Sequence, residues 1–334
     1  MFNLILSYSL ISFLILIFVA KISYKLNLVD IPNKRKKHLN PTAYTGGLAL
    51  SFIYIISILL FDIKDEKLNL ILPIAFLIAI VGFIDDIYHL NIGGKLSLQI
   101  FTIVYLIILE NFNLNQLGDY NYFKLELSSV SIPFTMLAVV FLINSFNYFD
   151  GLDGTLSFTS ISVLVILYFL TTDENIKLFL ITLLIPLLFF LFFNFSTFKL
   201  PKLFLGDSGS LLIGFIIAFT LIFIGNSREV HPILLAWSVA IFVYEFLSIN
   251  LIRLKNKKAA FKAGLDHLHH ILFKKTKTLF LTNFLISITN IIFFIIGYVS
   301  FKLINPLTSL ILFLFLFMIY FIVRLNFLNN KNFH

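Results

Sequence analysis

Amide and carboxylate side chains recur at every third position in one short segment of the chain. Asn144, Asn147, Asp150 and Asp153 share this spacing, and two glycines lie among them. A helical or near-helical turn would place all four side chains along one face. Their oxygen atoms suit Mg²⁺ and equally suit hydrogen bonds to a nucleotide or a sugar. A capped turn between two helices would leave the alignment unexplained, so the pattern predicts a ligand site.

A second cluster is the adjacent carboxylate pair Asp85 and Asp86, at the end of an apolar segment. Two neighbouring carboxylates repel each other unless a cation or a proton neutralises the pair. The pair therefore favours a divalent ion or a poised proton acceptor, and a solvated helix end is the alternative. Lys95, a little further on, is either a salt-bridge partner or a phosphate contact.

A third cluster is the segment Gly206-Asp207-Ser208-Gly209-Ser210. It places a carboxylate, two hydroxyls and free backbone N–H groups where an apolar helix begins. The dipole and the unpaired donors of such a helix end favour anions. The alternative for Asp207 is a plain N-cap, which would not exclude metal binding.

Basic and imidazole groups mark two further segments. Four consecutive cations at residues 34–37 precede Gly46 and Gly47, which permit close backbone approach to a phosphate, although a basic membrane anchor explains them equally well. Later, three of the seven histidines fall at His267, His269 and His270, directly after Asp266. These imidazoles favour hydrogen bonds or proton transfer to phosphate oxygens over metal binding, and a solvated loop is the alternative.

The elements that hold these clusters are expected to be membrane helices. Of 334 residues, 59% are hydrophobic and 13% are charged, whereas soluble domains carry about 25% charged residues. We predict an all-α, polytopic integral membrane protein with one membrane-embedded domain over residues 1–334 and ten or eleven transmembrane helices. The predicted spans begin near Phe2, Gly46, Leu70, Leu96, Val130, Thr155, Leu178, Gly209, Ile233, Leu279 and Pro306. The first is expected to be a retained helix, because no basic segment precedes it and no cleavage motif follows it.

The basic residues predict the orientation of these spans. One set of alternate loops holds 19 of the 25 Lys and Arg residues and the other set holds six. The positive-inside rule assigns the first set to the cytoplasm, which puts the N-terminus outside and the C-terminus inside. All five polar clusters fall on the cytoplasmic side. The net charge of +8 is explained by this topology and requires no nucleic-acid partner. The absence of cysteine excludes disulfides and thiolate metal sites.

Taken in order, the clusters resemble the motifs of the polyprenyl-phosphate N-acetylhexosamine-1-phosphate transferases, which form glycosyltransferase family 4. That family has a DD pair followed by a KLxxQ-like segment, as at Asp85-Asp86 and Lys95–Gln99 here. It has NAxNxxDGxDGL, matched from Asn144 with Ser for the first Ala, and FxGDxGS, matched at 204–210. It also has a late HxHH element, matched at 267–270. The ordered set extends over nearly the whole chain.

The resemblance implies transfer of a sugar 1-phosphate, here N-acetylglucosamine 1-phosphate, from a UDP-N-acetylhexosamine to undecaprenyl phosphate, with release of UMP. It implies Mg²⁺, or Mn²⁺ in its place, with Asp207 as metal ligand and Asn147 near the metal. Asp85 and Asp86 would serve the metal or the attacking phosphate, and Asp150 and Asp153 the nucleotide or catalysis. Lys95, Asn144 and the three histidines would bind substrate. The implied location is the bacterial inner membrane, with the site facing the cytoplasm and a homodimer left open.

The sequence departs from the family pattern in three further places. Ala43 replaces a proline of the first-loop motif, Glu245 stands where an Asp is usual, and Asp266 directly precedes the first histidine. None of these departures touches the core clusters. The histidine form and compact inner loops favour the N-acetylglucosamine branch, which serves O-antigen, enterobacterial or teichoic-acid glycans and so cell-wall and lipopolysaccharide synthesis.

Three alternatives to this assignment are weighed. The first is the phospho-N-acetylmuramoyl-pentapeptide transferase branch of the same family, which serves peptidoglycan synthesis. The second is a transporter of anionic or lipid-linked solutes, although transporters tend to place ionisable groups near mid-membrane and to carry internal repeats. The third is an inactive scaffold, against which the intact carboxylates argue.

Overall fold

The computed structural model describes residues 2–32, 40–257, 264 and 267–329. The chain is 78% helical and divides into two compact units, one comprising 1–111 and 172–220 and the other 112–171 and 221–334. The basic run at 34–37 and Asp266 lie outside the described residues. The prediction of an all-α membrane protein is confirmed, and the single domain over 1–334 stays a prediction.

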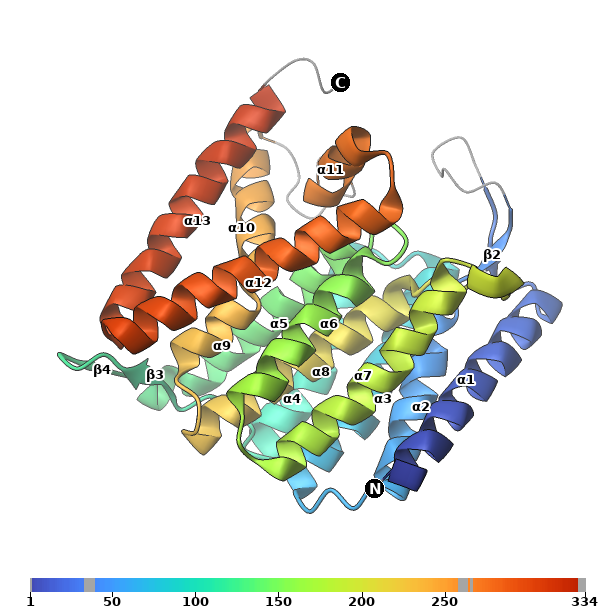
Figure 1. Cartoon of the computed structure of the whole chain (residues 1–334), viewed down its shortest axis with the longest axis horizontal. Coiled ribbons are helices and arrows are strands. Elements are labelled where there is room, and N and C mark those ends of the chain that lie inside the picture. The colour runs from blue at the N-terminus through green and yellow to red at the C-terminus, as the bar shows by residue number, and fades with distance from the viewer. Residues whose placement is uncertain (1, 33–39, 258–263, 265–266, 330–334) are drawn as a thin grey trace. The chain divides into compact units, whose positions relative to one another are not determined.

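The first unit is built from apolar helices joined by short connections (Figure 1). Its elements are α1 (Phe2–Lys25), β1 (Val29–Asp30), β2 (Thr42–Ala43), α2 (Gly46–Leu60), α3 (Glu66–Tyr88), α4 (Ile92–Val104), the π-helical turn η1 (Tyr105–Leu109), α7 (Glu174–Asn194), the 3₁₀ turn η3 (Thr197–Lys199) and α8 (Gly206–Ser227), whose last turns belong to the second unit. Helices α1, α2 and α7 pack against one another, and α3 packs against α2 and α4.

A short extended segment brings the start of α8 against the start of α2. Leu203 forms a parallel bridge with Ala43, and the N–H of Phe204 donates to the Ala43 carbonyl at 2.7 Å. The N–H groups of Gly46 and Gly47 then donate to the carbonyls of Phe204 and Leu205 at 3.0 and 2.9 Å. Two of the four unpaired donors at the start of α2 are satisfied in this way, and the polar segment after Leu205 is held in place.

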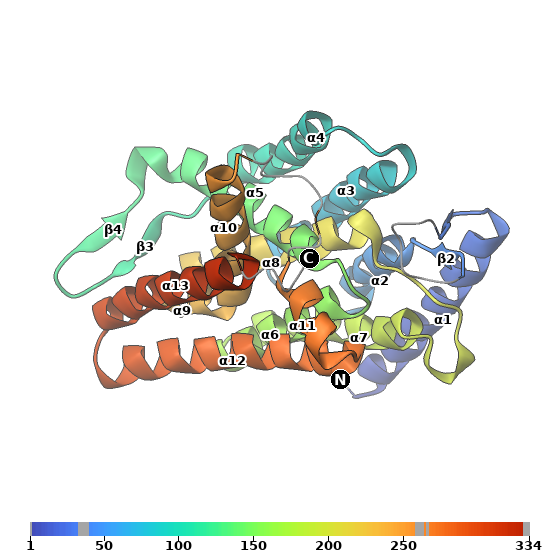
Figure 2. The ribbon, with the colours of Figure 1, turned by 90° about the horizontal axis from the view of Figure 1, so that it is seen from above.

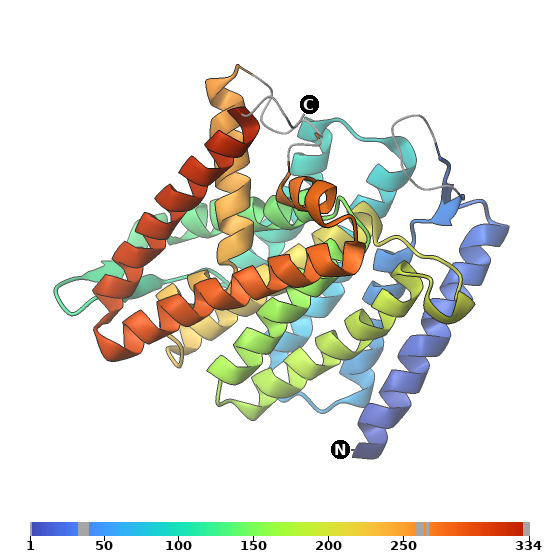
Figure 3. The same cartoon turned by 45° about the horizontal axis from the view of Figure 1, so that its top comes forward.

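The second unit comprises a hairpin and a group of helices, with α12 and α13 running side by side as an antiparallel pair (Figure 2). Its elements are β3 (Gln116–Asp119), β4 (Lys124–Glu126), the 3₁₀ turn η2 (Ser128–Val130), α5 (Ser131–Phe149), α6 (Thr155–Leu170), α9 (Pro232–Ser238), α10 (Ala240–Lys255), α11 (Leu268–Thr276), α12 (Leu279–Leu303) and α13 (Pro306–Asn329). Helix α12 packs along α6, α9 and α10 as well as α13, and the short α11 lies beside its first turns (Figure 3).

The predicted span from Ile233 is broken in the structure. Helices α9 and α10 meet at 71°, with Val239 out of helical geometry between them. The buried amide of Asn290 on α12 compensates for the break, since its Nδ2 donates to the Ser238 carbonyl at 2.9 Å and its Oδ1 accepts from the Ile241 N–H at 3.3 Å. A break at membrane depth needs such an internal partner, because hydrocarbon offers none.

Eight helices among the described residues are long and apolar enough to cross a membrane, and the bent pair makes nine. Each of the eleven predicted spans overlaps an apolar helix. However, α2 and α6 have only 15 and 16 residues, and a straight crossing needs roughly 20. The count of eleven and the orientation of the spans therefore stay predictions.

One glycine shows how closely the helices of the first unit approach. A Cβ atom on Gly82, in α3, would lie 2.5 Å from the backbone of Asp207 and Ser208. Only a residue without a side chain allows α3 to contact the start of α8 at this distance.

We therefore expect Gly82→Ala to lower the free energy of unfolding by about 1–3 kcal/mol, because backbone must shift to admit the methyl group. Thermal unfolding in detergent would measure the loss. Gly93→Ala is the matched control, since a Cβ there meets only the Asn91 side chain at 3.5 Å. Equal stability of the two variants would contradict the close-approach argument.

Candidate functional site

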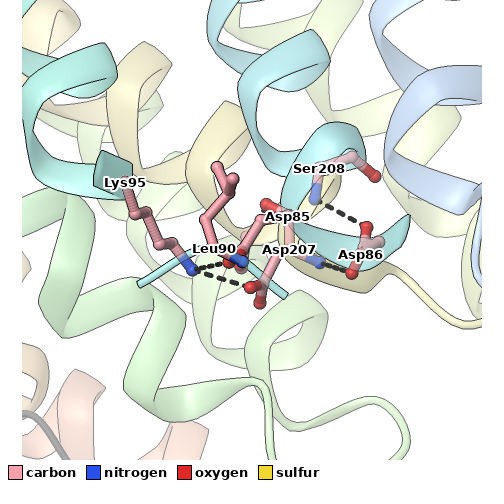
Figure 4. A network of polar contacts seen from close by, with 7 residues as sticks. Asp85, Asp86, Leu90, Lys95, Asp207 and Ser208 are labelled. Atoms are coloured by element: carbon pink, nitrogen blue, oxygen red, sulfur yellow. Dashed lines mark hydrogen bonds and ion pairs between the residues drawn. The ribbon is translucent and has the colours of Figure 1, made fainter. Parts of the chain in front are cut away.

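Three carboxylates and one lysine meet in the first unit. Lys95 Nζ lies 2.7 Å from Asp85 Oδ2 and 2.6 Å from Asp207 Oδ2 (Figure 4). The Lys95 and Asp85 side chains are 15% and 9% exposed, and that of Asp207 is 33% exposed. Asp86 lies on the other side of Asp207. The structure thus brings together four of the residues predicted from sequence, from three helices.

The turn between α3 and α4 determines where Lys95 lies. His89 ends α3 in the left-handed region with φ 51°, and Asn91 caps α4 by accepting from the Gly94 N–H at 2.7 Å. Asp85 Oδ1 accepts from the Leu90 N–H at 2.8 Å, which ties the turn to the end of α3. Asp85 therefore has two functions. One carboxylate oxygen orders the turn, and the other pairs with Lys95, which the turn brings back to the end of α3.

Asp86 caps helix α8 from a different helix. Its Oδ1 and Oδ2 accept from the N–H groups of Asp207 and Ser208 at 2.9 and 3.2 Å. These are unpaired donors of the first turn of α8, and a carboxylate at this end is favoured by the helix dipole. The alternative that Asp207 is merely an N-cap is wrong, since Asp207 lies inside the first turn and its own carboxylate pairs with Lys95.

The chemistry of this cluster fits a hard divalent cation. Asp85 Oδ2 and Asp207 Oδ2 both lie against the Lys95 ammonium, so two carboxylate oxygens already converge on one positive charge. Carboxylate oxygens are the ligands that Mg²⁺ prefers, and Mg²⁺ commonly uses one or two of them together with substrate phosphates. Within the described ranges, no three His, Asp or Glu side chains form a complete set of ligands. Water or substrate would therefore supply the remaining ligands of a cation bound here.

The second unit holds the Asn/Asp segment in a form that differs from the prediction. Helix α5 ends at Phe149, and the Asp150 N–H donates to the Asn147 carbonyl at 3.3 Å. Asn144 and Asn147 are therefore helical, whereas Asp150 and Asp153 lie in the turn that follows. The prediction of one aligned helical face is wrong beyond Phe149. The turn forms because Gly154, with φ 80°, can reverse the chain before α6.

Asn283, which the sequence analysis missed, holds this turn. Its Nδ2 donates to the Asp153 carbonyl at 2.7 Å, and its Oδ1 accepts from the Thr155 hydroxyl at 2.7 Å. Asn283 is fully buried on α12. A polar residue within a long apolar run was the only signal in the sequence, and spacing alone could not reveal its partner.

The histidine element packs against the end of α5. The rings of Tyr148 and His267 lie edge to face with centroids 5.1 Å apart, and Phe149 contacts His269. His267 and His269 are 7% and 1% exposed, whereas His270 is half-buried. The alternative of a solvated loop is therefore wrong for these residues. A Cβ atom on Gly151 would collide with the His269 ring, so this glycine makes room for an imidazole.

Burial lowers the pKa of His269 well below its usual value, and the charges of His270, His267 and Arg324 lower it further. His269 is therefore neutral at physiological pH. Among the described residues its Nε2 is buried and has no hydrogen-bond partner. A neutral imidazole in this position supports its neighbours by packing.

The carboxylate–lysine cluster and the Asn/Asp/His group belong to different units. Each group is assembled as described, and the prediction that all five loops form one site stays a prediction.

A cavity of about 670 Å³ opens elsewhere in the second unit, at the far ends of α6 and α12. Its charged lining residues are Asp119, Lys124, Arg228, Glu229, His231 and Lys302. It contains none of the residues predicted from sequence. Acidic and basic side chains both line it, so it lacks the uniformly positive lining that would favour an anionic substrate.

Comparison with known proteins agrees with the motifs. The sequence model of glycosyl transferase family 4 matches residues 68–225, which include Asp85, Asp86, Lys95 and Asp207. An undecaprenyl-phosphate alpha-N-acetylglucosaminyl 1-phosphate transferase of Pasteurella multocida is 30% identical, over 79% of this chain and 76% of its own length. The chain belongs to this family. Transferases of the same name from Yersinia pestis and Escherichia coli K12 are 27% and 25% identical, over 91% and 78% of this chain and 86% and 73% of their own lengths.

Replacing Lys95 with Met tests whether the carboxylate–lysine cluster binds a cation. We expect the free energy of unfolding to fall by about 3 kcal/mol without divalent ions, because Asp85 and Asp207 lose their shared partner. Mg²⁺ should then raise the melting temperature more than it does in the wild type. The control is Lys124→Met, since Lys124 is 66% exposed and its pair with Asp119 spans 3.5 Å. An equal response of both variants to Mg²⁺ would contradict a cation site.

Acid should destabilise the packing of His269. Because its pKa in the folded state is lowered, stability is complete above the ordinary histidine pKa of about 6.5 and falls as the pH drops below it, by up to about 1.4 kcal/mol per pH unit. Melting temperatures measured from pH 7.5 to 5 should show this fall, and His269→Leu should flatten it. Burial also lowers the pKa of His231, which contributes equally to both proteins. Identical slopes would contradict the assignment to His269.

Proposed function

We propose that this protein transfers N-acetylglucosamine 1-phosphate from UDP-N-acetylglucosamine to undecaprenyl phosphate and releases UMP. The observation that carries the proposal is the cluster in which Lys95 joins Asp85 and Asp207 from separate helices. Membership of glycosyl transferase family 4 and the activity in the relatives' names support the same reaction. The proposed product is a polyprenyl diphosphate sugar, the first membrane intermediate of a surface glycan.

The reaction exchanges one phosphorus–oxygen bond for another. An oxygen of the acceptor phosphate attacks the phosphorus that carries the sugar. The bond from this phosphorus to the bridging oxygen breaks, and UMP departs with the electron pair. The acceptor phosphate is largely ionised at neutral pH, since its second pKa is about 6, so a strong base is not required. The protein's main task is to align three phosphate groups and to offset their repulsion.

The carboxylate–lysine cluster is suited to that task. Members of the family generally depend on a divalent metal. In our proposal Asp207 binds Mg²⁺, and Asp85 shares the Lys95 ammonium with it. Asn147 is the further ligand that the family motif predicts. The metal would offset the negative charge of the phosphates. Lys95 would contact the phosphate oxygens, and Asp86 keeps the first turn of α8 in place.

The Asn/Asp/His group of the second unit is proposed to bind the donor. Asp150 and Asp153, on a turn held by Asn283, would bind the nucleotide or sugar hydroxyls. His270 is the most accessible of the three imidazoles and would contact the phosphates together with His267. His269 is the least accessible, and in this proposal it orients the other two.

The proposed location is the inner membrane of a bacterium, with the reaction at the cytoplasmic surface. The apolar helices and the bacterial relatives support a multi-pass inner-membrane protein. The distribution of Lys and Arg supports the orientation. Sugar nucleotides are made in the cytoplasm and undecaprenyl phosphate is held in the bilayer, so a site at this surface is accessible to both substrates.

Asp207→Asn and Asp86→Asn should each reduce UMP release from UDP-N-acetylglucosamine at least about 100-fold, because each removes a charge from the cluster that aligns the phosphates. Asparagine at position 86 still offers one oxygen to the first turn of α8, and asparagine at position 207 keeps the size of the side chain, so both variants should fold. The assay uses membranes supplied with Mg²⁺ and undecaprenyl phosphate.

Asp119→Asn is the matched control, since Asp119 is an exposed carboxylate paired with Lys124. A panel of UDP-sugars in the same assay would identify the donor. Unchanged turnover in both cluster variants would contradict the proposed reaction, and solute uptake without UMP release would favour a transporter.

A further inference from the structure

A buried ion pair in the second unit is not used by the proposed chemistry. Glu245 on α10 and Arg324 on α13 are each 1% exposed. Arg324 Nε donates to Glu245 Oε2 at 2.8 Å and Arg324 Nη2 donates to Oε1 at 2.9 Å, a two-point contact. The Tyr320 hydroxyl, also on α13, donates to Oε2 at 2.7 Å. In the sequence, Glu245 stands out only as a departure from the family pattern.

The same carboxylate also contacts the histidine element. The N–H of Leu268, the first residue of α11, donates to Glu245 Oε1 at 2.7 Å. This N–H is one of the four donors that a helix start leaves unpaired, and a negative charge is favoured at this end. Glu245 therefore caps α11 from another helix. His267, the N-cap residue of α11, offers no side-chain hydrogen bond of its own to this end.

Leu268 lies between His267 and His269, so its backbone position determines where both imidazoles lie. Their rings stack in parallel with centroids 5.4 Å apart, and they pack on Tyr148 and Phe149 of α5. A rotation of the first turn of α11 would move both rings away from these contacts. The hydrogen bond from Leu268 to Glu245 opposes that rotation.

The cost of burying the pair also points to more than stability. A buried ion pair is seldom more stabilising than apolar side chains of equal volume, because both charges must be desolvated. Here the arginine and the tyrosine use three donors to orient one carboxylate, and the carboxylate has a lone pair left for Leu268. The arrangement is what a residue needs if it must hold a backbone N–H in one place.

We propose that Glu245 is a positioning residue, oriented by Arg324 and Tyr320, that fixes the first turn of α11 and with it the histidine element. The last helix, α13, is thereby part of the donor-binding machinery although it carries none of the family motifs. The inference rests on the proposed function for its effect on turnover, and on the contacts alone for its effect on α11.

The test compares Glu245→Gln with the charge-exchanged double variant Glu245→Arg, Arg324→Glu in the full-length protein. The charge-exchanged double variant keeps an ion pair between α10 and α13 but removes the acceptor for the Leu268 N–H. Hydrogen–deuterium exchange in detergent would follow the amides of α11, and UMP-release assays would give KM for UDP-N-acetylglucosamine and for undecaprenyl phosphate. Glu229→Gln, at the other end of the unit, is the control, because it removes a carboxylate that accepts from the Thr171 hydroxyl.

We expect charge exchange to lower amide protection in α11 at least 10-fold and to raise KM for the donor at least 10-fold, with KM for the acceptor unchanged. Glu245→Gln keeps one acceptor oxygen but loses the charge that Arg324 orients, so it should show a smaller loss of protection and a smaller rise in donor KM. Glu229→Gln should change neither. A merely structural ion pair predicts the opposite, namely that charge exchange restores normal α11 protection and donor KM. That result would overturn the proposal.

If either Glu245 variant does not fold, Tyr320→Phe provides a milder test. Tyr320→Phe keeps the ion pair and removes one donor to Glu245, so we expect a smaller but measurable loss of α11 protection. Unchanged protection in that variant would overturn the proposal. If the wild type releases no UMP from any UDP-sugar, the proposed function fails. The hydrogen–deuterium exchange of the α11 amides still decides whether Glu245 positions this turn.

Discussion

A charged side chain buried among apolar helices must find its partner within the protein, and both units are organised around this requirement. In the first unit, Lys95 is placed between Asp85 and Asp207 at 2.7 and 2.6 Å. In the second, Arg324 is paired at two points with Glu245. Hydrocarbon does not solvate such groups, so each pair determines how its helices meet as well as what chemistry is available.

In both units a carboxylate from one helix also caps another helix. Asp86 of α3 accepts from the first turn of α8, and Glu245 of α10 accepts from the first residue of α11. A local cap orders only its own turn. A cap supplied from a distant segment makes the start of one helix depend on the position of another. The positions of the side chains on that first turn are then fixed by the same contact. Here those side chains belong to Asp207 and the histidine element.

Backbone groups that helices leave unpaired are satisfied by the same strategy. Asn283 and Asn290 on α12 hold, respectively, the turn after α5 and the break between α9 and α10. Each amide both donates and accepts, so one side chain makes two contacts with the segment that it holds. Helix α12 therefore supports the donor-side turn of the proposed site along with the bent span. Its polar residues are structural, although they stand in an apolar run like functional ones.

Local features were readable from the sequence alone. Apolar runs predicted the helices, and residue order and spacing identified Asp85, Asp86, Lys95, Asp207 and the Asn/Asp and histidine segments, because hydrophobicity and local geometry depend on neighbours along the chain. The tertiary structure decided which groups meet. It joined Lys95 to Asp207, gave the cap of α8 to Asp86, ended α5 before Asp150 and paired Glu245 with Arg324. These partners are separated by up to 122 residues of chain, and no local pattern specifies a contact that depends on how separate helices pack.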